Sequence, residues 1–300
     1  MSSPAPDALS ALLLRLGAGP GRLRAWSLVI TVFGDAVAPR GGVLRLAALQ
    51  DVVGHLGVEP GALRTAMSRL ARDGWLERER RGRASFYALT AAKREELQAA
   101  TRRIYAAGPP DWAGAWRLAA LGPEADAAPL RAAGFAEAAP GLMLRPETAQ
   151  APPAPRPAGV SLFETPPGAA ALDPDLLRRA WPEAVARPRL AEAAAAVEAL
   201  SPWAAAQPAP LDALAARALL LHLWRRAALA SAELPQALRP ADWPGETARQ
   251  AVRRLYWRLA PASERWLDAC DGGPEGALPP LDPAFAARFG GPPPDEETTP

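Results

Sequence analysis

The segment from Val58 to Leu89 constrains the fold most, because it joins three local patterns in a fixed order. Residues 60–72 carry apolar side chains at helical spacing, and residues 75–80 and 84–89 both have the composition of strands. Arg81, Gly82 and Arg83 separate these two runs. A short glycine-centred connection between two strand patterns predicts a hairpin. We therefore expect a helix followed directly by a β-hairpin.

The expected helix has two different faces. At about 100° per residue, one apolar stripe is formed by Leu63, Ala66, Met67 and Leu70. The opposite side and its margins carry small, polar and cationic residues, namely Gly61, Arg64, Thr65, Ser68, Arg69 and Arg72. Pro60 suits the first helical position and Gly74 suits the residue after the end. One face is thus predicted to be core and the other to meet a partner.

The upstream residues extend this pattern. Residues 24–33 form a nearly continuous apolar run, and residues 46–53 predict a second helix. Residues 34–42 have the composition of a loop. We therefore expect a winged helix-turn-helix domain at residues 20–107. Its elements follow in the order helix, loop, helix, short turn, helix and hairpin. In such domains the last helix enters the major groove of DNA.

The residues expected to contact DNA follow from this placement. Small polar side chains on the helix suit base edges, and arginines on the helix and at the hairpin tip suit phosphates. The predicted contacts are Arg64, Thr65, Ser68, Arg69, Arg72, Arg80, Arg81 and Arg83. Because charge runs are usually solvated faces, a surface hairpin with no nucleic-acid partner stays the alternative.

Charge is divided unevenly along the chain. Residues 1–106 hold 16 Lys and Arg against 9 Asp and Glu, a net charge of +7. The whole chain carries +2, so residues 107–300 carry −5. A basic N-terminal module on an acidic remainder favours nucleic-acid binding at one end only. All basic residues but Lys93 are arginine, in a chain rich in Ala and Pro, which weakens arginine enrichment as evidence.

The rest of the chain predicts two further domains and a tail. Residues 108–168 read as a small α+β unit, with strands at 116–121, 141–146 and 159–164 and a helix at 124–133. The proline-rich residues 151–157 cannot form a helix interior. Residues 169–275 read as helical, and residues 276–300 as a disordered acidic tail. The expected fold class is therefore α+β and multidomain.

Chemistry-bearing motifs are absent from the sequence. The chain has His55 and His222 and one cysteine, Cys270, so no familiar metal cluster can be assembled. It has no phosphate-binding loop, nucleophile elbow or zinc-protease motif. We predict no enzyme, no catalytic residue, no metal and no cofactor. A single cysteine and the lack of about 18 consecutive apolar residues predict a cytoplasmic protein without a membrane span.

Five segments taken in order resemble the PaaX family, repressors of phenylacetate catabolic operons. They are WSLVITVFGDAVAPRGG, GWLERERRGRASFYALT, AGAWRLAAL, AAGFAEAAPGLMLRP and LLLHLWRRAALASAELPQALRPADWPG. The stretches GDAVAPRGG and ALRPADWPG are the most specific, because neither is generic winged-helix sequence.

This resemblance implies a homodimer that binds a double-stranded DNA operator and is released by an aryl-CoA thioester such as phenylacetyl-CoA. It also implies that the central unit is ferredoxin-like, related to Cas2 and used for dimer contacts. The C-terminal helical domain at 169–275 is expected to serve effector binding and dimerisation. The position of the metal-binding Asp of Cas2-type nucleases falls near Leu121 and Gly122, so no nuclease activity is expected.

The C-terminal half offers four candidate effector residues. His222, Arg225 and Arg226 lie on one predicted helix, and Trp243 follows in sequence. Arginines pair with CoA phosphates, and a tryptophan stacks on adenine or aryl groups. The alternative is that these arginines bridge acidic groups within the helical bundle and that Trp243 packs in a corner.

Two other functions remain open from the sequence. The winged helix would serve equally in a protein-interaction module, with its arginines providing solubility. The chain would also suit a regulator of another catabolic operon, with a different acyl-CoA or small-molecule effector.

Overall fold

The computed structural model describes residues 9, 13–14, 23–168 and 172–294. The chain divides into two compact units. The first comprises residues 1–107, 189–229 and 247–300, and the second comprises residues 108–188 and 230–246. The sequence pattern predicted three domains and a tail, whereas the fold groups most of the C-terminal helices with the N-terminal segment. The fold class is mixed α+β with two antiparallel sheets.

The N-terminal elements of the first unit follow the predicted order. They are α2 (Ala25–Val32), β1 (Val43–Arg45), α3 (Leu46–Gly54), α4 (Pro60–Arg72), β2 (Leu76–Arg81), β3 (Ala84–Leu89) and α5 (Ala91–Ile104). The loop predicted at 34–42 is wrong in part. A π-helical turn η1 (Phe33–Val37) and a 3-10 turn η2 (Ala38–Arg40) continue α2, because Phe33, Ala36 and Val37 are buried.

A small antiparallel sheet closes this segment. Its strand order is β1-β3-β2, and Arg81 pairs with Ala84 across the hairpin tip. Gly82 adopts φ +58° in that tip, a left-handed conformation that glycine accepts without steric cost. Strand β1, which the sequence pattern did not predict, pairs Leu44 with Tyr87. The hairpin is therefore anchored on one side by β1 while β2 forms the edge.

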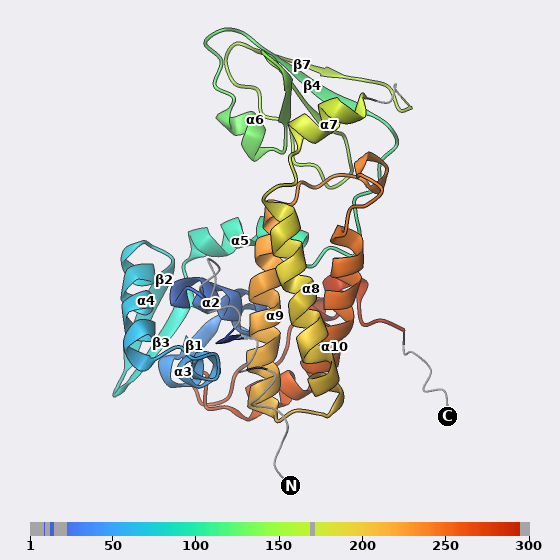
Figure 1. The fold of residues 1–300 in the computed structure, drawn as a ribbon. Coiled ribbons are helices and arrows are strands. Elements are labelled where there is room, and N and C mark those ends of the chain that lie inside the picture. The colour runs from blue at the N-terminus through green and yellow to red at the C-terminus, as the bar shows by residue number, and fades with distance from the viewer. Residues whose placement is uncertain (1–8, 10–12, 15–22, 169–171, 295–300) are drawn as a thin grey trace, which may run out of the picture. The chain divides into compact units, whose positions relative to one another are not determined.

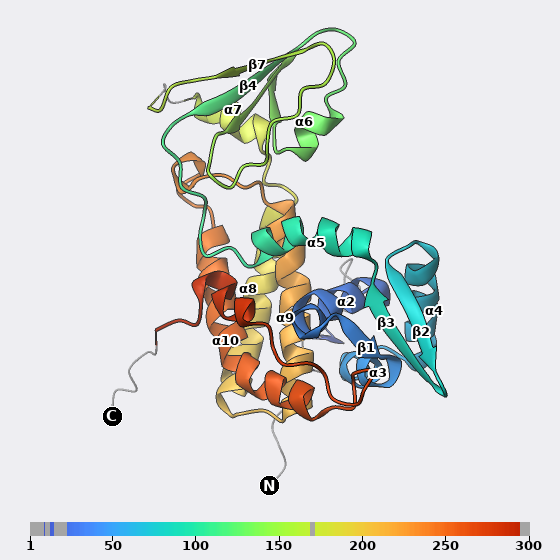
Figure 2. The ribbon, with the colours of Figure 1, turned by 180° about the vertical axis from the view of Figure 1, so that it is seen from behind.

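Three long helices complete the first unit. They are α8 (Ala186–Ala205), α9 (Pro210–Ala230) and α10 (Gly245–Ala269), which run side by side in Figures 1 and 2. Helix α9 is buried almost all round, as its apolar sequence predicts. The π-turn, α5, α9 and α10 meet through buried charged and aromatic side chains.

The disordered tail predicted from residue 276 is wrong for residues 276–294. They include the 3-10 segment η4 (Pro283–Gly290), in which Phe285 and Phe289 are buried. The Phe289 ring is 0% exposed and packs edge-on against Tyr105 and Tyr256. These aromatic contacts outweigh the Gly and Pro content that suggested disorder. Residues 295–300 lie outside the described residues.

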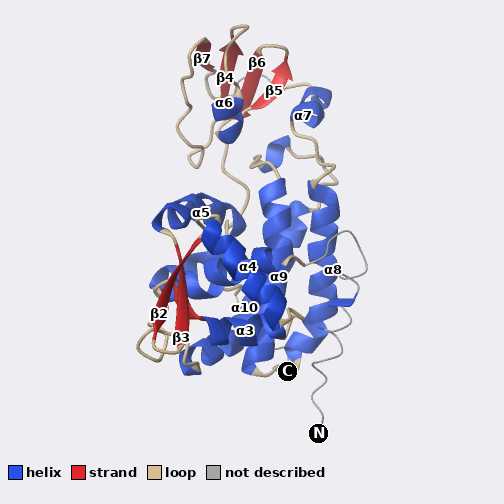
Figure 3. Ribbon diagram, turned by 90° about the vertical axis from the view of Figure 1, so that its left-hand side faces the viewer, coloured by secondary structure: helices blue, strands red, loops and turns tan. Residues whose placement is uncertain are grey.

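The second unit is built on a four-stranded antiparallel sheet. Its elements are β4 (Trp116–Leu121), α6 (Ala128–Ala132), β5 (Ala136–Ala139), β6 (Leu142–Pro146), β7 (Val160–Glu164), α7 (Pro174–Ala180) and the 3-10 turn η3 (Gln236–Leu238). The strand order is β5-β6-β4-β7. Figure 3 shows α6 on one face of this sheet. The helix predicted at 124–133 is therefore shorter than expected, and β5 was not predicted.

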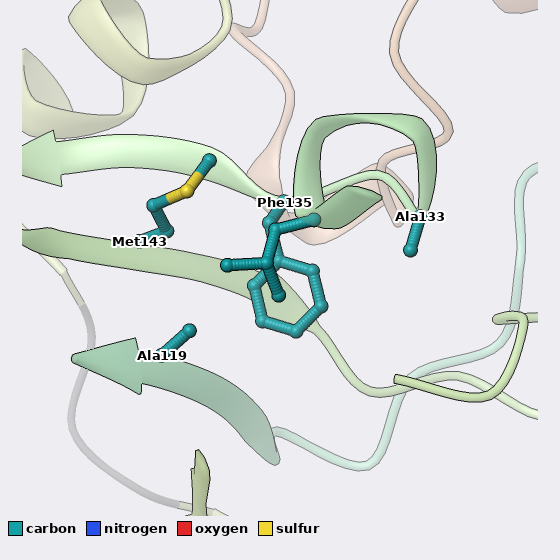
Figure 4. Packing of buried hydrophobic residues seen from close by; sticks show 5 residues of the cluster. Ala119, Ala133, Phe135 and Met143 are labelled. Atoms are coloured by element: carbon teal, nitrogen blue, oxygen red, sulfur yellow. The ribbon is translucent and has the colours of Figure 1, made fainter. Parts of the chain in front are cut away.

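The core of this unit lies between the sheet and α6. Ala119, Leu130, Ala133, Phe135 and Met143 form one buried cluster. Figure 4 shows Ala119, Ala133, Phe135 and Met143 of this cluster. Arg145 is also buried, and it donates hydrogen bonds of 2.6 Å to the carbonyl oxygens of Ala133 and Pro152. Residues 151–157 form no helix, as their prolines predict, and Arg145 contacts this segment at the Pro152 carbonyl oxygen.

Candidate DNA interface and effector residues

Helix α4 has the two faces that its sequence predicts. Leu63, Ala66, Met67 and Leu70 are buried, and Trp75 N–H donates to the Leu70 carbonyl at 2.8 Å to close the helix end. The predicted DNA-contact residues on this helix are all exposed, namely Arg64, Thr65, Ser68, Arg69 and Arg72. The buried stripe thus fixes the helix on the core and leaves a polar, cationic surface facing solvent.

The helix arginines differ in the contacts that they make. Arg69 and Arg72 share Asp73, with Nε–Oδ distances of 3.4 and 3.2 Å. Arg69 also lies 5.9 Å from the centre of the Trp26 ring. No ion pair joins Arg64 to any residue that the structure describes. Exposed pairs of this kind are worth about 0–1 kcal/mol, so a phosphate can replace Asp73 at small cost.

The hairpin brings Arg80, Arg81 and Arg83 together at its tip, all exposed. Arg80 donates to the Gly82 carbonyl at 3.2 Å. Arg81 is the most restrained, because it pairs with Glu79 at 2.7 Å and donates to the Pro274 carbonyl at 3.3 Å. Its pKa is raised, first by the hydrogen bond to Glu79. Arg83 has no ion pair within the described part of the chain.

One cation of this surface was missed by sequence reasoning. Arg78 is exposed on β2 two residues before Arg80, donates to Ser85 Oγ at 2.8 Å and lies 6.0 Å from the centre of the Tyr87 ring. Alternate residues of a strand share a face, so the spacing of Arg78 and Arg80 would have revealed it. The exposed face of α4 and the hairpin together form a surface that we call the α4–hairpin surface, comprising the eight predicted residues and Arg78.

Two of the predicted effector residues on α9 are bound to α2. His222 is 3% exposed, and its Nδ1 lies 3.4 Å from Thr31 Oγ1. Burial, helped by the charges of Arg225 and Arg226, lowers the pKa of His222 to about 3. Arg225 donates to Ser27 Oγ at 2.7 Å and to the Ser27 carbonyl at 3.2 Å. Its pKa is lowered by burial and then by Arg226.

The other two predicted effector residues lie in different surroundings. Arg226 pairs with Glu192 of α8 at 3.3 Å. Trp243 belongs to the second unit, where the guanidinium groups of Arg187 and Arg239 lie 5.6 and 4.5 Å from its ring centre. The structure therefore gives each of the four a protein partner and does not gather them around one cavity. Their role in effector binding stays a prediction.

A buried ionic cluster connects the N-terminal segment to the C-terminal helices. Its centre is Asp35 of η1, whose side chain is 2% exposed. Asp35 Oδ1 accepts from the hydroxyls of Tyr105 (2.8 Å) and Tyr256 (3.0 Å). Arg217 Nε donates to Oδ2 at 2.7 Å, and Arg288 Nη1 donates to Oδ1 at 2.6 Å. We call Asp35, Tyr105, Arg217, Tyr256 and Arg288 the Asp35 cluster.

The charges of this cluster compensate one another. Burial alone raises the pKa of Asp35, but Arg217 and Arg288 outweigh it and hold that pKa below its ordinary value. Arg217 is 0% exposed, and its Nη1 also donates to Glu264 at 2.6 Å. Arg40 reaches the other Glu264 oxygen at 2.8 Å. Since breaking a buried pair leaves an uncompensated charge, each member depends on the others.

The Asp35 cluster was not predicted as a set. Asp35 and Arg40 lie in the GDAVAPRGG stretch, whereas Arg217, Glu264 and Arg288 come from α9, α10 and η4. The cluster thus ties the turn after α2 to three C-terminal elements.

No group of three or more His, Cys, Asp or Glu side chains in the described ranges is placed to hold a metal ion. No helix among the described residues is long and apolar enough to cross a membrane. Cys270 is half-buried with a raised pKa, first because of burial.

Comparison with known proteins gives the class of this chain. A family model described as PaaX-like protein matches residues 24–93, and one described as PaaX-like protein C-terminal domain matches residues 181–269. These ranges contain the α4–hairpin surface and most of the helical bundle. The chain belongs to the PaaX-like family.

One curated relative agrees with this assignment. The chain is similar to the Transcriptional repressor PaaX of Escherichia coli (strain K12), with 33% identity over 290 residues. The match covers 88% of this chain and 90% of that protein. Among solved structures, the uncharacterized protein Rv0674 from Mycobacterium tuberculosis matches 88% of this chain and 99% of its own, with 19% identity and a TM-score of 0.39.

Proposed function

We propose that this chain is a DNA-binding transcriptional repressor of the PaaX type. The observation that carries the proposal is the α4–hairpin surface. A helix fixed by its buried stripe presents Arg64, Thr65 and Ser68 to solvent, and an arginine-rich hairpin tip follows it. The family relation and the printed function of the Escherichia coli relative support the same conclusion.

Residues 24–90 act in this proposal as a winged helix-turn-helix. Helices α2, α3 and α4 precede the β2–β3 hairpin, and β1 pairs with β3. Helix α4 then enters the major groove, where Thr65 and Ser68 contact base edges and Arg64, Arg69 and Arg72 contact phosphates. Arg80, Arg81 and Arg83 contact the backbone or the minor groove beside it.

The second unit serves as a ferredoxin-like domain in this proposal. Its strand order β5-β6-β4-β7 places the first strand between the third and the fourth. That order, with α6 between the first two strands, supports a ferredoxin-like origin. The non-helical proline segment 151–157 stands where a second helix would cross.

In this proposal a small-molecule effector regulates DNA binding. The protein binds its operator as a homodimer, and an aryl-CoA thioester such as phenylacetyl-CoA releases it. Helices α8, α9 and α10 carry the response, with His222, Arg225, Arg226 and Trp243 as predicted effector contacts. The contacts of His222 and Arg225 with α2 support a route from these helices to the DNA-binding segment.

The direct test is duplex binding by the full chain and by matched variants. We expect the purified protein to bind its own promoter region and the Arg72→Ala and Arg83→Ala variants to bind at least tenfold more weakly. The exposed Arg179→Ala variant of α7 is the control and should bind as the wild type does. Unchanged affinity in both surface variants would show that DNA is contacted elsewhere.

A protein-interaction module is the second function that the same surface would serve. It predicts no binding to random duplex DNA at low salt, whereas a repressor binds such DNA through phosphate contacts. Filter binding with a random duplex separates the two.

A further inference from the structure

The second unit contains a cavity that none of the four predicted effector residues lines. Its volume is about 170 Å³, and it lies between α7 and the segment around η3. Its wall includes the apolar side chains of Leu177, Trp181, Leu234 and Leu238 and the charged side chains of Arg178, Glu183 and Arg239. We call it the α7–η3 pocket.

The apolar wall has a rigid aromatic side. The Trp181 ring stacks on Trp116 of β4 with 6.3 Å between ring centres and 25° between planes. Trp116 in turn packs edge-on against Trp112 at 5.1 Å. Leu234 is buried, so the opposite wall is also fixed. A cavity shaped by packed rings keeps its form in the absence of a ligand, which lowers the cost of binding.

The volume of the pocket limits its occupant. An apolar protein cavity of about 150 Å³ takes up a benzene ring. At about 170 Å³, the α7–η3 pocket has room for one aromatic ring with a short substituent.

Arg239 determines which polar group a ligand of this pocket should carry. Arg239 donates to the Ala232 carbonyl and lies 4.5 Å from the Trp243 ring centre. Burial lowers the pKa of Arg239 to about 10, and Glu183 opposes this only in part. Glu183 is itself paired with Arg187 at 2.7 Å. Among the described residues, no carboxylate forms an ion pair with Arg239.

A half-buried guanidinium without an ion-pair partner favours an oxygen ligand. We propose that the α7–η3 pocket binds one aromatic ring joined by a short link to a carboxylate or a thioester carbonyl. The ring lies against Trp181, Leu177 and Leu238, and the oxygen accepts from Arg239. Where this ligand is the aryl-acyl group of the aryl-CoA effector, this inference rests on the proposed function. Two sources share this chemistry, a free aryl acid and its CoA thioester.

Titration calorimetry on the full chain tests the proposal with three probes, namely phenylacetate, CoA and phenylacetyl-CoA. We expect phenylacetate or phenylacetyl-CoA to bind the wild type, and CoA alone to bind at least tenfold more weakly than the thioester. Binding of phenylacetate identifies the free acid as sufficient, whereas binding of the thioester alone identifies the acyl-CoA. Lack of binding by all three probes, or equal binding of CoA and its thioester, would overturn the proposal.

Two variants and a control locate the binding site. Arg239→Gln removes the cation and should weaken binding at least tenfold, and Leu238→Trp fills the pocket and should abolish binding. Arg179→Gln, on the exposed side of α7, should bind as the wild type does. Wild-type affinity in Arg239→Gln overturns the proposal even if Leu238→Trp does not fold, which circular dichroism will show.

Operator binding separates this inference from the proposed function. We expect Arg239→Gln to bind DNA as the wild type does but to need at least tenfold more ligand for release. Release of wild type and variant at the same concentration would refute the pocket and leave the repressor function standing. A wild type that does not bind DNA would refute the repressor function, while calorimetry would still decide the pocket.

Discussion

Replacing Asp35 by Asn tests whether the buried ionic cluster holds the first unit together. The substitution keeps the size of the side chain but removes the charge that Arg217 and Arg288 share. Arg217 retains Glu264 at 2.6 Å, whereas Arg288 retains only neutral acceptors, the Gly34 and Asp35 carbonyls and the Tyr256 hydroxyl. Arg288 therefore becomes a buried cation without a counter-ion.

The expected loss of stability can be worked from this geometry. Removing one partner of a buried pair costs about 3–5 kcal/mol. For a unit of this size each kcal/mol lowers Tm by about 2–4 °C, so Asp35→Asn should melt roughly 6–20 °C below the wild type. The fold lowers the pKa of Asp35 below the ordinary carboxyl value of about 4. The ionised carboxylate therefore adds its full share to the free energy of unfolding above about pH 4, and that share is lost as the pH falls through the folded-state pKa. The difference between the two proteins should therefore shrink in acid.

Thermal unfolding followed by circular dichroism at pH 7 and pH 3 provides the assay. Asp268→Asn is the control, because Asp268 pairs with Arg40 but is 64% exposed. We expect the control to cost about 0–1 kcal/mol. If Asp35→Asn melts within about 2 °C of the wild type at pH 7, less than the shift of a single kcal/mol, the Asp35 cluster does not stabilise the fold.

Three further predictions concern His222, η4 and the reading face of α4. Because the pKa of His222 is lowered to about 3, the unfolded chain takes up a proton near pH 6.5 that the folded chain does not. Stability should fall by about 2 kcal/mol from pH 7 to pH 5, and His222→Gln should remove that part of the pH dependence in urea titrations. Phe289→Ala should cost about 3–5 kcal/mol in the same assay, and a cost below about 1 kcal/mol would mean that η4 is not part of the core. Thr65→Ala with Ser68→Ala should change the sequences selected from a random duplex library while leaving the salt dependence of binding unchanged, and an unchanged preference would contradict their assignment to base edges.

The elements that follow from local pattern were predictable from the sequence. The stripe from Leu63 to Leu70 repeats at the helical period, so the buried face of α4 is readable without a structure. The β2–β3 hairpin is equally local, since Gly82 marks its turn and both strands adjoin it. Proline content also correctly predicted that residues 151–157 form no helix.

The parts that depend on distant contacts were not predictable. Strand β1 is a strand only because Leu44 pairs with Tyr87. Asp35 stands in a segment with loop composition, and its partner Arg288 lies 253 positions away. Residues 276–294 pack because Phe289 meets Tyr105 and Tyr256, whereas their own composition favours disorder. Hydrophobic periodicity predicts the local secondary structure of a segment. It does not predict which residues far apart in the sequence will contact each other.

The salt dependence of duplex binding tests the assignment of the α4–hairpin surface most directly. Replacing Arg64, Arg72 and Arg83 by Gln should reduce the slope of log K against log salt by about 0.9 for each phosphate that the protein no longer neutralises, roughly 3 in total. The matched control replaces Arg254, Arg258 and Arg265, three exposed arginines of α10, and changes the net charge equally. We predict a shallower slope and weaker binding for the surface variant only. Equal slopes for the wild type and both variants would contradict DNA binding through α4 and the hairpin.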